Sequence, residues 1–122
     1  MTWLMVFLGG GVGAIMRFGV SILTQKIPAP YFPVGTLLSN ILASFMVGAI
    51  GIIILKMKPE QAALYYAFWI IGVCGGFSTF STFAKENLDL LEQGKYLIAG
   101  LNILISVGLT VFMVYGGRKW VG

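Results

Sequence analysis

Residues 61–84 read QAALYYAFWIIGVCGGFSTFSTFA, about two dozen residues without a charged side chain. A helix needs about 20 mostly apolar residues to cross the hydrocarbon core of a bilayer, so this run is long enough to span it. It is nevertheless a poor helix near its middle. The adjacent Gly75 and Gly76 cost about 1 kcal/mol each relative to alanine, and the hydroxyls that follow compete for backbone hydrogen bonds. The run therefore predicts a membrane-spanning helix that is broken near its middle.

Three other apolar runs of similar length accompany this one. The four expected spans are approximately residues 3–24, 33–55, 61–84 and 96–115. The expected connections are 25–32 with two prolines, 56–60 around Pro59, and the polar stretch 85–95. The first run has no basic residue before it and is too long for the apolar core of a signal peptide, so it is expected to stay as a helix. We predict an all-α membrane protein with four transmembrane helices in a single domain, residues 1–122.

The composition supports a bilayer as the solvent. Of the 122 residues, 58% are hydrophobic and 10% are charged, and the mean hydropathy is +0.93. A soluble domain is about one quarter charged. We therefore expect a multi-pass protein of the cell (inner or plasma) membrane. The chain has no histidine, and its four acids and one cysteine form no plausible catalytic cluster, so we do not expect an enzyme.

The basic residues are spread singly or in pairs, mainly at the ends of the apolar runs. The side of the membrane with both termini carries Lys56, Lys58, Arg118 and Lys119, and the other side carries Lys26, Lys85 and Lys95, with Arg17 reaching towards it. No basic patch suited to nucleic acid results. A lysine and arginine excess normally sets orientation, so this near-tie indicates a chain that can insert both ways. Dominance of one orientation through subtler signals stays open.

The interrupted segment of the third run has two readings. In channels and transporters such segments lie where freed backbone groups line a cavity or coordinate an ion. Clustered hydroxyls offer donors to an anion, and unwound carbonyls offer oxygens to a hard cation such as Na⁺. Alternatively, the glycines form a helix-packing face and the hydroxyls bond back to the preceding turn.

Polar residues inside the other runs also need partners. Asn40 lies about two turns into the second run, with Thr36 on the same face, and its partner is either another helix or a permeating species. In the first run, Gly9 and Gly13 have the spacing of a packing face. Arg17 is expected either to anchor that helix at the interface or to set a positive field at a pore mouth. In the fourth run a polar stripe faces protein or water, and it consists of Asn102, Ser106 and Thr110.

Three motifs together resemble those of the Fluc family of fluoride channels, also called CrcB. They are Gly-Ala-x-x-Arg-Phe at 13–18, Gly-Thr-Leu-x-x-Asn at 35–40, and Gly-Gly-Phe-Ser-Thr-Phe-Ser-Thr-Phe at 75–83. The resemblance covers the whole chain. It implies passive export of fluoride from the cytoplasm through an antiparallel, dual-topology homodimer that has two pores and a structural Na⁺ at its centre.

The resemblance also implies roles for particular residues. The Na⁺ ligands would be backbone carbonyls of Gly75 and Ser78, and the aromatic pair lining each pore would be Phe80 and Phe83. Polar contacts along the path would come from Asn40, Ser81, Thr82 and Thr110, and the pore entrance would hold Glu86 and Arg17. Hydroxyls, an amide and the electropositive edges of aromatic rings suit a small anion that must lose its water.

Two other functions compete with a fluoride channel. A small multidrug-type dual-topology transporter is also a short chain of four helices, but it would need a glutamate within the membrane, and the first span here carries Arg17 instead. A non-conducting assembly subunit is the second alternative, and flux measured in liposomes would separate it from a channel.

Overall fold

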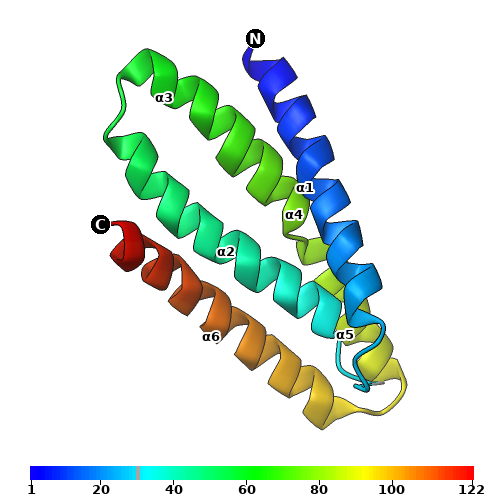
Figure 1. Cartoon of the computed structure of the whole chain (residues 1–122). Coiled ribbons are helices and arrows are strands. Elements are labelled where there is room, and N and C mark those ends of the chain that lie inside the picture. Colours follow the sequence, from blue (N-terminus) through cyan, green and yellow to red (C-terminus); the bar gives the residue numbers. More distant parts are fainter. Residues whose placement is uncertain (30) are drawn as a thin grey trace.

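The computed structural model describes residues 1–29 and 31–122, and its helices account for most of them (Figure 1). In chain order they are α1 (Thr2–Thr24), α2 (Val34–Leu55), α3 (Pro59–Tyr65), the π-helical η1 (Tyr66–Cys74), α4 (Gly75–Phe77), α5 (Phe80–Glu92) and α6 (Tyr96–Val121). Four stretches are long and apolar enough to cross a membrane, the third running from Pro59 to Glu92 with the break inside it. The prediction of an all-α membrane protein with four transmembrane helices and a broken third helix is confirmed. Pro30, in the expected 25–32 connection, lies outside the described residues.

The structure differs from the expected boundaries by more than two residues at two helix ends. The third span continues past Ala84 to Glu92, where we expected a polar connection, because Lys85 and Asp89 form an i,i+4 ion pair at 2.7 Å on the exposed face. Phe83, Asn87 and Leu90 supply a buried stripe with helical spacing on the opposite face. The last helix continues past Tyr115 to Val121, and its basic last turn suits the negative end of the helix dipole.

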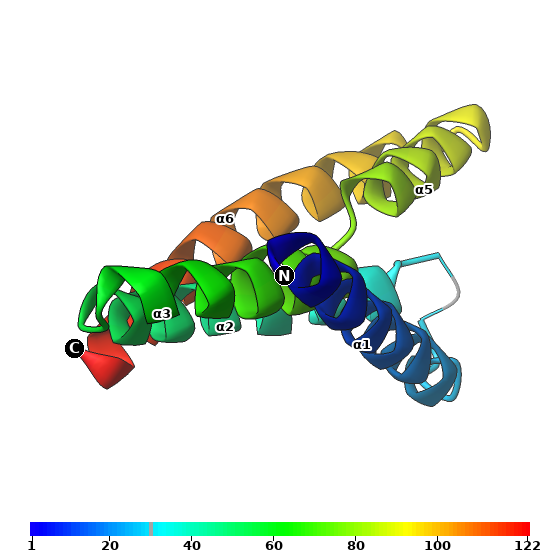
Figure 2. The ribbon, with the colours of Figure 1, turned by 90° about the horizontal axis from the view of Figure 1, so that it is seen from above.

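The helices form two closely packed pairs. One pair is α1 with the rod formed by η1 and α4, and the other is α2 with α6 (Figure 1). Fewer contacts join α2 to α1 and to η1. After the break, α5 extends beside α6 and away from α1, as the view from above shows (Figure 2). The break in the third span therefore lies where the two pairs meet.

Glycines allow close packing of the first helix pair, α1 with η1 and α4. A Cβ placed on Gly9 or Gly13 would meet the carbonyl of Phe68 or Val73, respectively, well inside the 3.0 Å that real Cβ atoms essentially never cross. Gly9 and Gly13 are both buried. The packing reading of these two glycines is confirmed, since only glycine lets the two backbones approach this closely. We call this contact the α1 seam.

The second pair is closed in the same way. A Cβ on Gly48 of α2 would strike the Val114 carbonyl, and a Cβ on Gly117 of α6 would strike the Phe45 carbonyl. A packing role for Gly48 and Gly117 was not predicted from the sequence. Their contact, which we call the α6 seam, fixes how α6 lies along α2 and therefore where the polar stripe of α6 points.

Candidate functional site

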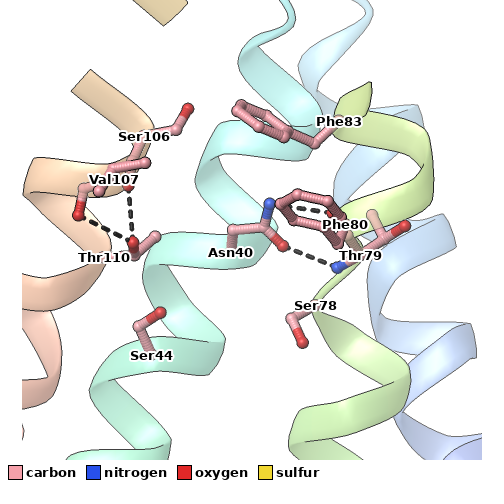
Figure 3. A pocket seen from close by; sticks show the side chains of 9 residues that line it. All are labelled: Asn40, Ser44, Ser78, Thr79, Phe80, Phe83, Ser106, Val107 and Thr110. Atoms are coloured by element: carbon pink, nitrogen blue, oxygen red, sulfur yellow. Dashed lines mark hydrogen bonds between the residues drawn. The ribbon is translucent and has the colours of Figure 1, made fainter. Parts of the chain in front are cut away.

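The break in the third span consists of two residues with extended backbone. Ser78 has φ −80° and ψ 156°, and Thr79 has φ −150° and ψ 120°. In a continuous helix the Thr79 N–H would donate to the Gly75 carbonyl. Instead it donates to Asn40 Oδ1 at 2.8 Å, while Asn40 Nδ2 donates to the Thr79 carbonyl at 3.2 Å (Figure 3). One amide from α2 thus satisfies both backbone groups of Thr79, so Asn40 has a protein partner in the extended segment of the third span.

Thr79 also starts the second half of the span. Its Oγ1 accepts a hydrogen bond from the Thr82 N–H at 3.2 Å, which caps the N-terminus of α5. That bond uses a lone pair of the oxygen and leaves the hydroxyl proton, which Thr79 can donate either to Ser81 Oγ or into the groove. Ser81 Oγ lies 3.5 Å from the same oxygen, on the exposed side of the helix.

The first half of the span ends in carbonyl groups with changed partners. Arg17 Nε donates to the Gly76 carbonyl at 3.0 Å, so the guanidinium of α1 lies at the negative end of the η1–α4 rod. Ser78 Oγ bonds back to the Cys74 carbonyl at 2.8 Å. The Gly75 carbonyl has lost its helical donor, Thr79 N–H, to Asn40. Oxygens of this kind suit a hard cation.

The two glycines before the break have different roles. A Cβ on Gly76 would come within 2.5 Å of the Gly10 carbonyl, so Gly76 belongs to the α1 seam. Gly75 is exposed, with room for a Cβ. Gly76 is therefore a helix-packing residue, as one of the two interpretations expected. The Ser78 hydroxyl bonds back to the preceding turn, as the same interpretation expected. The segment is broken all the same, because Asn40 replaces the missing helical partner of Thr79.

A groove of about 280 Å³, which we call the central groove, opens beside the break (Figure 3). Its lining residues are Asn40, Ser44, Ser78, Thr79, Phe80, Phe83, Ser106, Val107 and Thr110. The Phe80 and Phe83 rings lie 5.7 Å apart between centroids and are tilted by 44°. Phe83 is only 8% exposed, whereas Phe80 is 80% exposed. The structure thus brings together the expected aromatic pair, Asn40 and Thr110.

A second hollow of about 300 Å³ lies on the α1 side of the break, and we call it the lateral cavity. Its lining residues are Ala14, Arg17, Phe18, Ser21, Gly35, Thr36, Ser39, Thr79 and Thr82. Several hydroxyls therefore face one guanidinium. Of the expected site residues, Arg17 and Thr82 belong to this cavity, whereas the exposed Ser81 lines neither hollow. Thr79 lines both and connects them.

Glu86 lines neither of these two hollows. It lines a third one of about 190 Å³, together with Tyr31 and Asp89 among others. Its Oε1 is buried and has no hydrogen-bond partner among the residues that the structure describes. Lys95 Nζ lies 3.6 Å from the centroid of the Tyr31 ring and holds the two loops at this end together.

Several polar residues of the site were not predicted from the sequence. Thr79 was given no role of its own, although the motif contains it, and Ser44 was given none, although it lies one turn after Asn40 on α2. Asn87, which is 6% exposed, donates to the Phe83 carbonyl at 2.9 Å and accepts from Asn102. The available signal was its position, one turn after Phe83 on the buried stripe of α5.

Comparison with known proteins gives one consistent result. Residues 4–118 match the family described as CrcB-like protein, Camphor Resistance (CrcB). A relative from Coxiella burnetii (strain CbuK_Q154) is 40% identical over 91% of this chain and 90% of its own length, and it is named fluoride-specific ion channel FluC. A relative from Shewanella baltica (strain OS185) with the same name is 42% identical over 97% and 94% of the two chains. The family match spans nearly the whole sequence, and the chain belongs to the CrcB-like family.

Proposed function

We propose that this protein is a passive, fluoride-selective ion channel that exports fluoride from the cytoplasm. The observation that carries the proposal is the central groove, where the Asn40 amide, the Thr79 hydroxyl and two phenylalanine rings lie together at the break. Asn40 uses one amide proton on Thr79 and keeps the other, so the groove has donors from both residues. Donors and ring edges can replace the water of a small anion. The names of the relatives support the same ion.

The path that we propose uses both hollows. Arg17 gives the lateral cavity a positive potential that attracts anions towards the break, and Thr82 supplies a hydroxyl there. The ion then passes the Phe80 and Phe83 rings, with Ser81 on the exposed face of α5 and Thr110 on the opposite wall. Glu86, in the middle of α5, lies at the entrance in this proposal.

A second copy of the chain completes each pore in this proposal. The central groove is open and is lined by hydroxyl and amide side chains, for which lipid offers no partners at bilayer depth. The balanced lysine and arginine count favours a partner in the opposite orientation, which gives an antiparallel homodimer with two pores. Carbonyls of Gly75 and Ser78 from both subunits would then offer four oxygens to a central Na⁺.

Fluoride efflux from liposomes that hold only the purified protein tests the proposal. We expect rapid fluoride efflux, little chloride efflux from the same vesicles, and no change when a proton gradient is dissipated. Comparable chloride flux would overturn the selectivity, and flux that needs a proton gradient would favour the multidrug-type transporter. Cysteine probes at a terminus should label from both sides of the membrane, and labelling from one side would contradict the antiparallel dimer.

A further inference from the structure

A chain of hydrogen bonds runs from α6 into α5 behind the central groove. Asn87 Nδ2 donates to the Phe83 carbonyl at 2.9 Å, and Asn102 Nδ2 donates to Asn87 Oδ1 at 2.9 Å. Ser106 Oγ is bonded to Asn102 Oδ1 at 3.1 Å. Asn102 is 1% exposed, and Asn87 and Ser106 are each 6% exposed. The chain connects two residues that line the groove, Phe83 and Ser106, through two that do not.

The Phe83 carbonyl, at one end of this chain of hydrogen bonds, determines which atom donates in every bond. A carbonyl oxygen only accepts, so the Asn87 atom that faces Phe83 is the amide nitrogen, and its oxygen faces Asn102. Asn102 must then donate to that oxygen and turn its own oxygen to Ser106. The single hydroxyl proton of Ser106 is therefore donated away from the groove, to Asn102.

The second hydroxyl on the α6 wall of the groove, that of Thr110, also donates its proton to a protein acceptor. Thr110 Oγ1 donates to the Ser106 carbonyl at 2.7 Å, so its proton is also committed (Figure 3). Ser106 and Thr110 can present only lone pairs to the groove. The donors, Asn40 and Thr79, lie on the opposite wall. One wall of the groove thus donates hydrogen bonds and the other accepts them.

We propose that Asn87 and Asn102 are positioning residues that keep the Ser106 proton out of the pore, an inference that rests on the proposed function. With the proton held, the α6 wall accepts hydrogen bonds from water beside the anion and does not bind the anion itself. If the Ser106 hydroxyl turned towards fluoride, Asn102 Oδ1 would lose its hydrogen bond from Ser106. Water could not replace that bond, because Asn102 is only 1% exposed. The ion is therefore bound on one side only, and weak binding lets it leave as well as enter.

A cycle of three variants in liposomes tests this, read as the fluoride concentration that gives half-maximal flux. Ser106→Ala should lower that concentration by about twofold, since it removes a dipole whose negative end faces the anion. Asn102→Leu frees the Ser106 hydroxyl for a charge-assisted bond to the anion and should lower it at least about tenfold. Asn102→Leu with Ser106→Ala should return to the value of Ser106→Ala alone. A rise with Ser106→Ala, no shift with Asn102→Leu, or a shift that persists in the double variant would each overturn the proposal.

Thermal melting of the detergent-solubilised protein in alkaline buffer separates this proposal from the proposed function, because it needs no flux. Aspartate has the shape of asparagine but does not donate when ionised. Asn87→Asp keeps the oxygen that accepts from Asn102 and turns its other oxygen towards the Phe83 carbonyl, which still accepts the helical N–H of residue 87. Asn102→Asp instead leaves the buried Asn87 Oδ1 without its donor, so Asn102→Asp should melt at the lower temperature. The opposite order would mean that the chain runs the other way, with Ser106 free to donate into the groove. Absence of fluoride flux in the wild type would instead refute the channel.

Discussion

Asn40 is the residue whose replacement tests most directly how the break is held. Asn40→Ala removes the bonds of 2.8 and 3.2 Å to the N–H and carbonyl of Thr79. Each stranded backbone group costs about 1 to 3 kcal/mol, so the free energy of unfolding should fall by about 2 to 6 kcal/mol. Ser44→Ala is the matched control for stability, because it removes a polar group one turn further along the same groove and leaves the bonds of Thr79 in place.

Asn40→Asp separates holding the break from conducting the ion. The carboxylate keeps an acceptor for the Thr79 N–H at the N-terminus of α5 but no longer donates to the Thr79 carbonyl, so the free energy of unfolding should fall by about 1 to 3 kcal/mol, about half of the loss in Asn40→Ala. Its charge, however, faces the groove. Two like charges about 4 Å apart repel by about 4 kcal/mol at an effective dielectric constant of 20, which is about a thousandfold in rate.

The assay pairs denaturant or thermal unfolding with fluoride efflux for each variant. Asn40→Ala should lose stability and flux together, whereas Asn40→Asp should lose about half as much stability and still conduct almost nothing. If Asn40→Ala unfolds like wild type, the amide does not hold the break. If Asn40→Asp conducts at the wild-type rate, the groove is not the path.

Three other perturbations have distinct expected outcomes. Phe80→Ile and Phe83→Ile should assemble normally by size-exclusion chromatography yet conduct fluoride far more slowly, because isoleucine keeps bulk and loses the polarised ring edge; wild-type flux in both would make the rings ordinary packing. Gly48→Ala should prevent stable folding, because its Cβ would strike the Val114 carbonyl, whereas Gly51→Ala, with nothing within 4 Å, should melt like wild type; equal melting of the two would refute the α6 seam. Replacing Na⁺ throughout with a large organic cation should lower flux, and unchanged flux with Na⁺ rigorously absent would remove the central ion.

The four helices could be predicted because a bilayer imposes one length on every span, and the apolar runs have that length. The break could be predicted as well, but not its exact position. The glycines are the visible signal, and both are helical, with Gly76 packed against α1. The chain becomes extended only at Ser78 and Thr79, where the Asn40 amide is within reach.

The partners of the polar residues could not be predicted from the sequence. Arg17 bonds to Gly76 and Asn40 to Thr79, across separations of 59 and 39 residues, and each pairing depends on how the helices are rotated about their axes. Rotation is set by the glycine contacts between helices. The composition of an apolar run does not show which of its glycines makes such a contact. In α1, Gly9 and Gly13 make it, whereas Gly10 and Gly11 have open space where a Cβ would be.

The two seams also determine where such a protein can change. Each is closed by backbone against backbone, so there is no side chain that a substitution can shorten to make room. More space near the break has to come from the joint between the two helix pairs, where Asn40 meets Thr79. A population of variants selected to pass a larger ion should therefore collect its substitutions around that joint while the seam glycines stay unchanged.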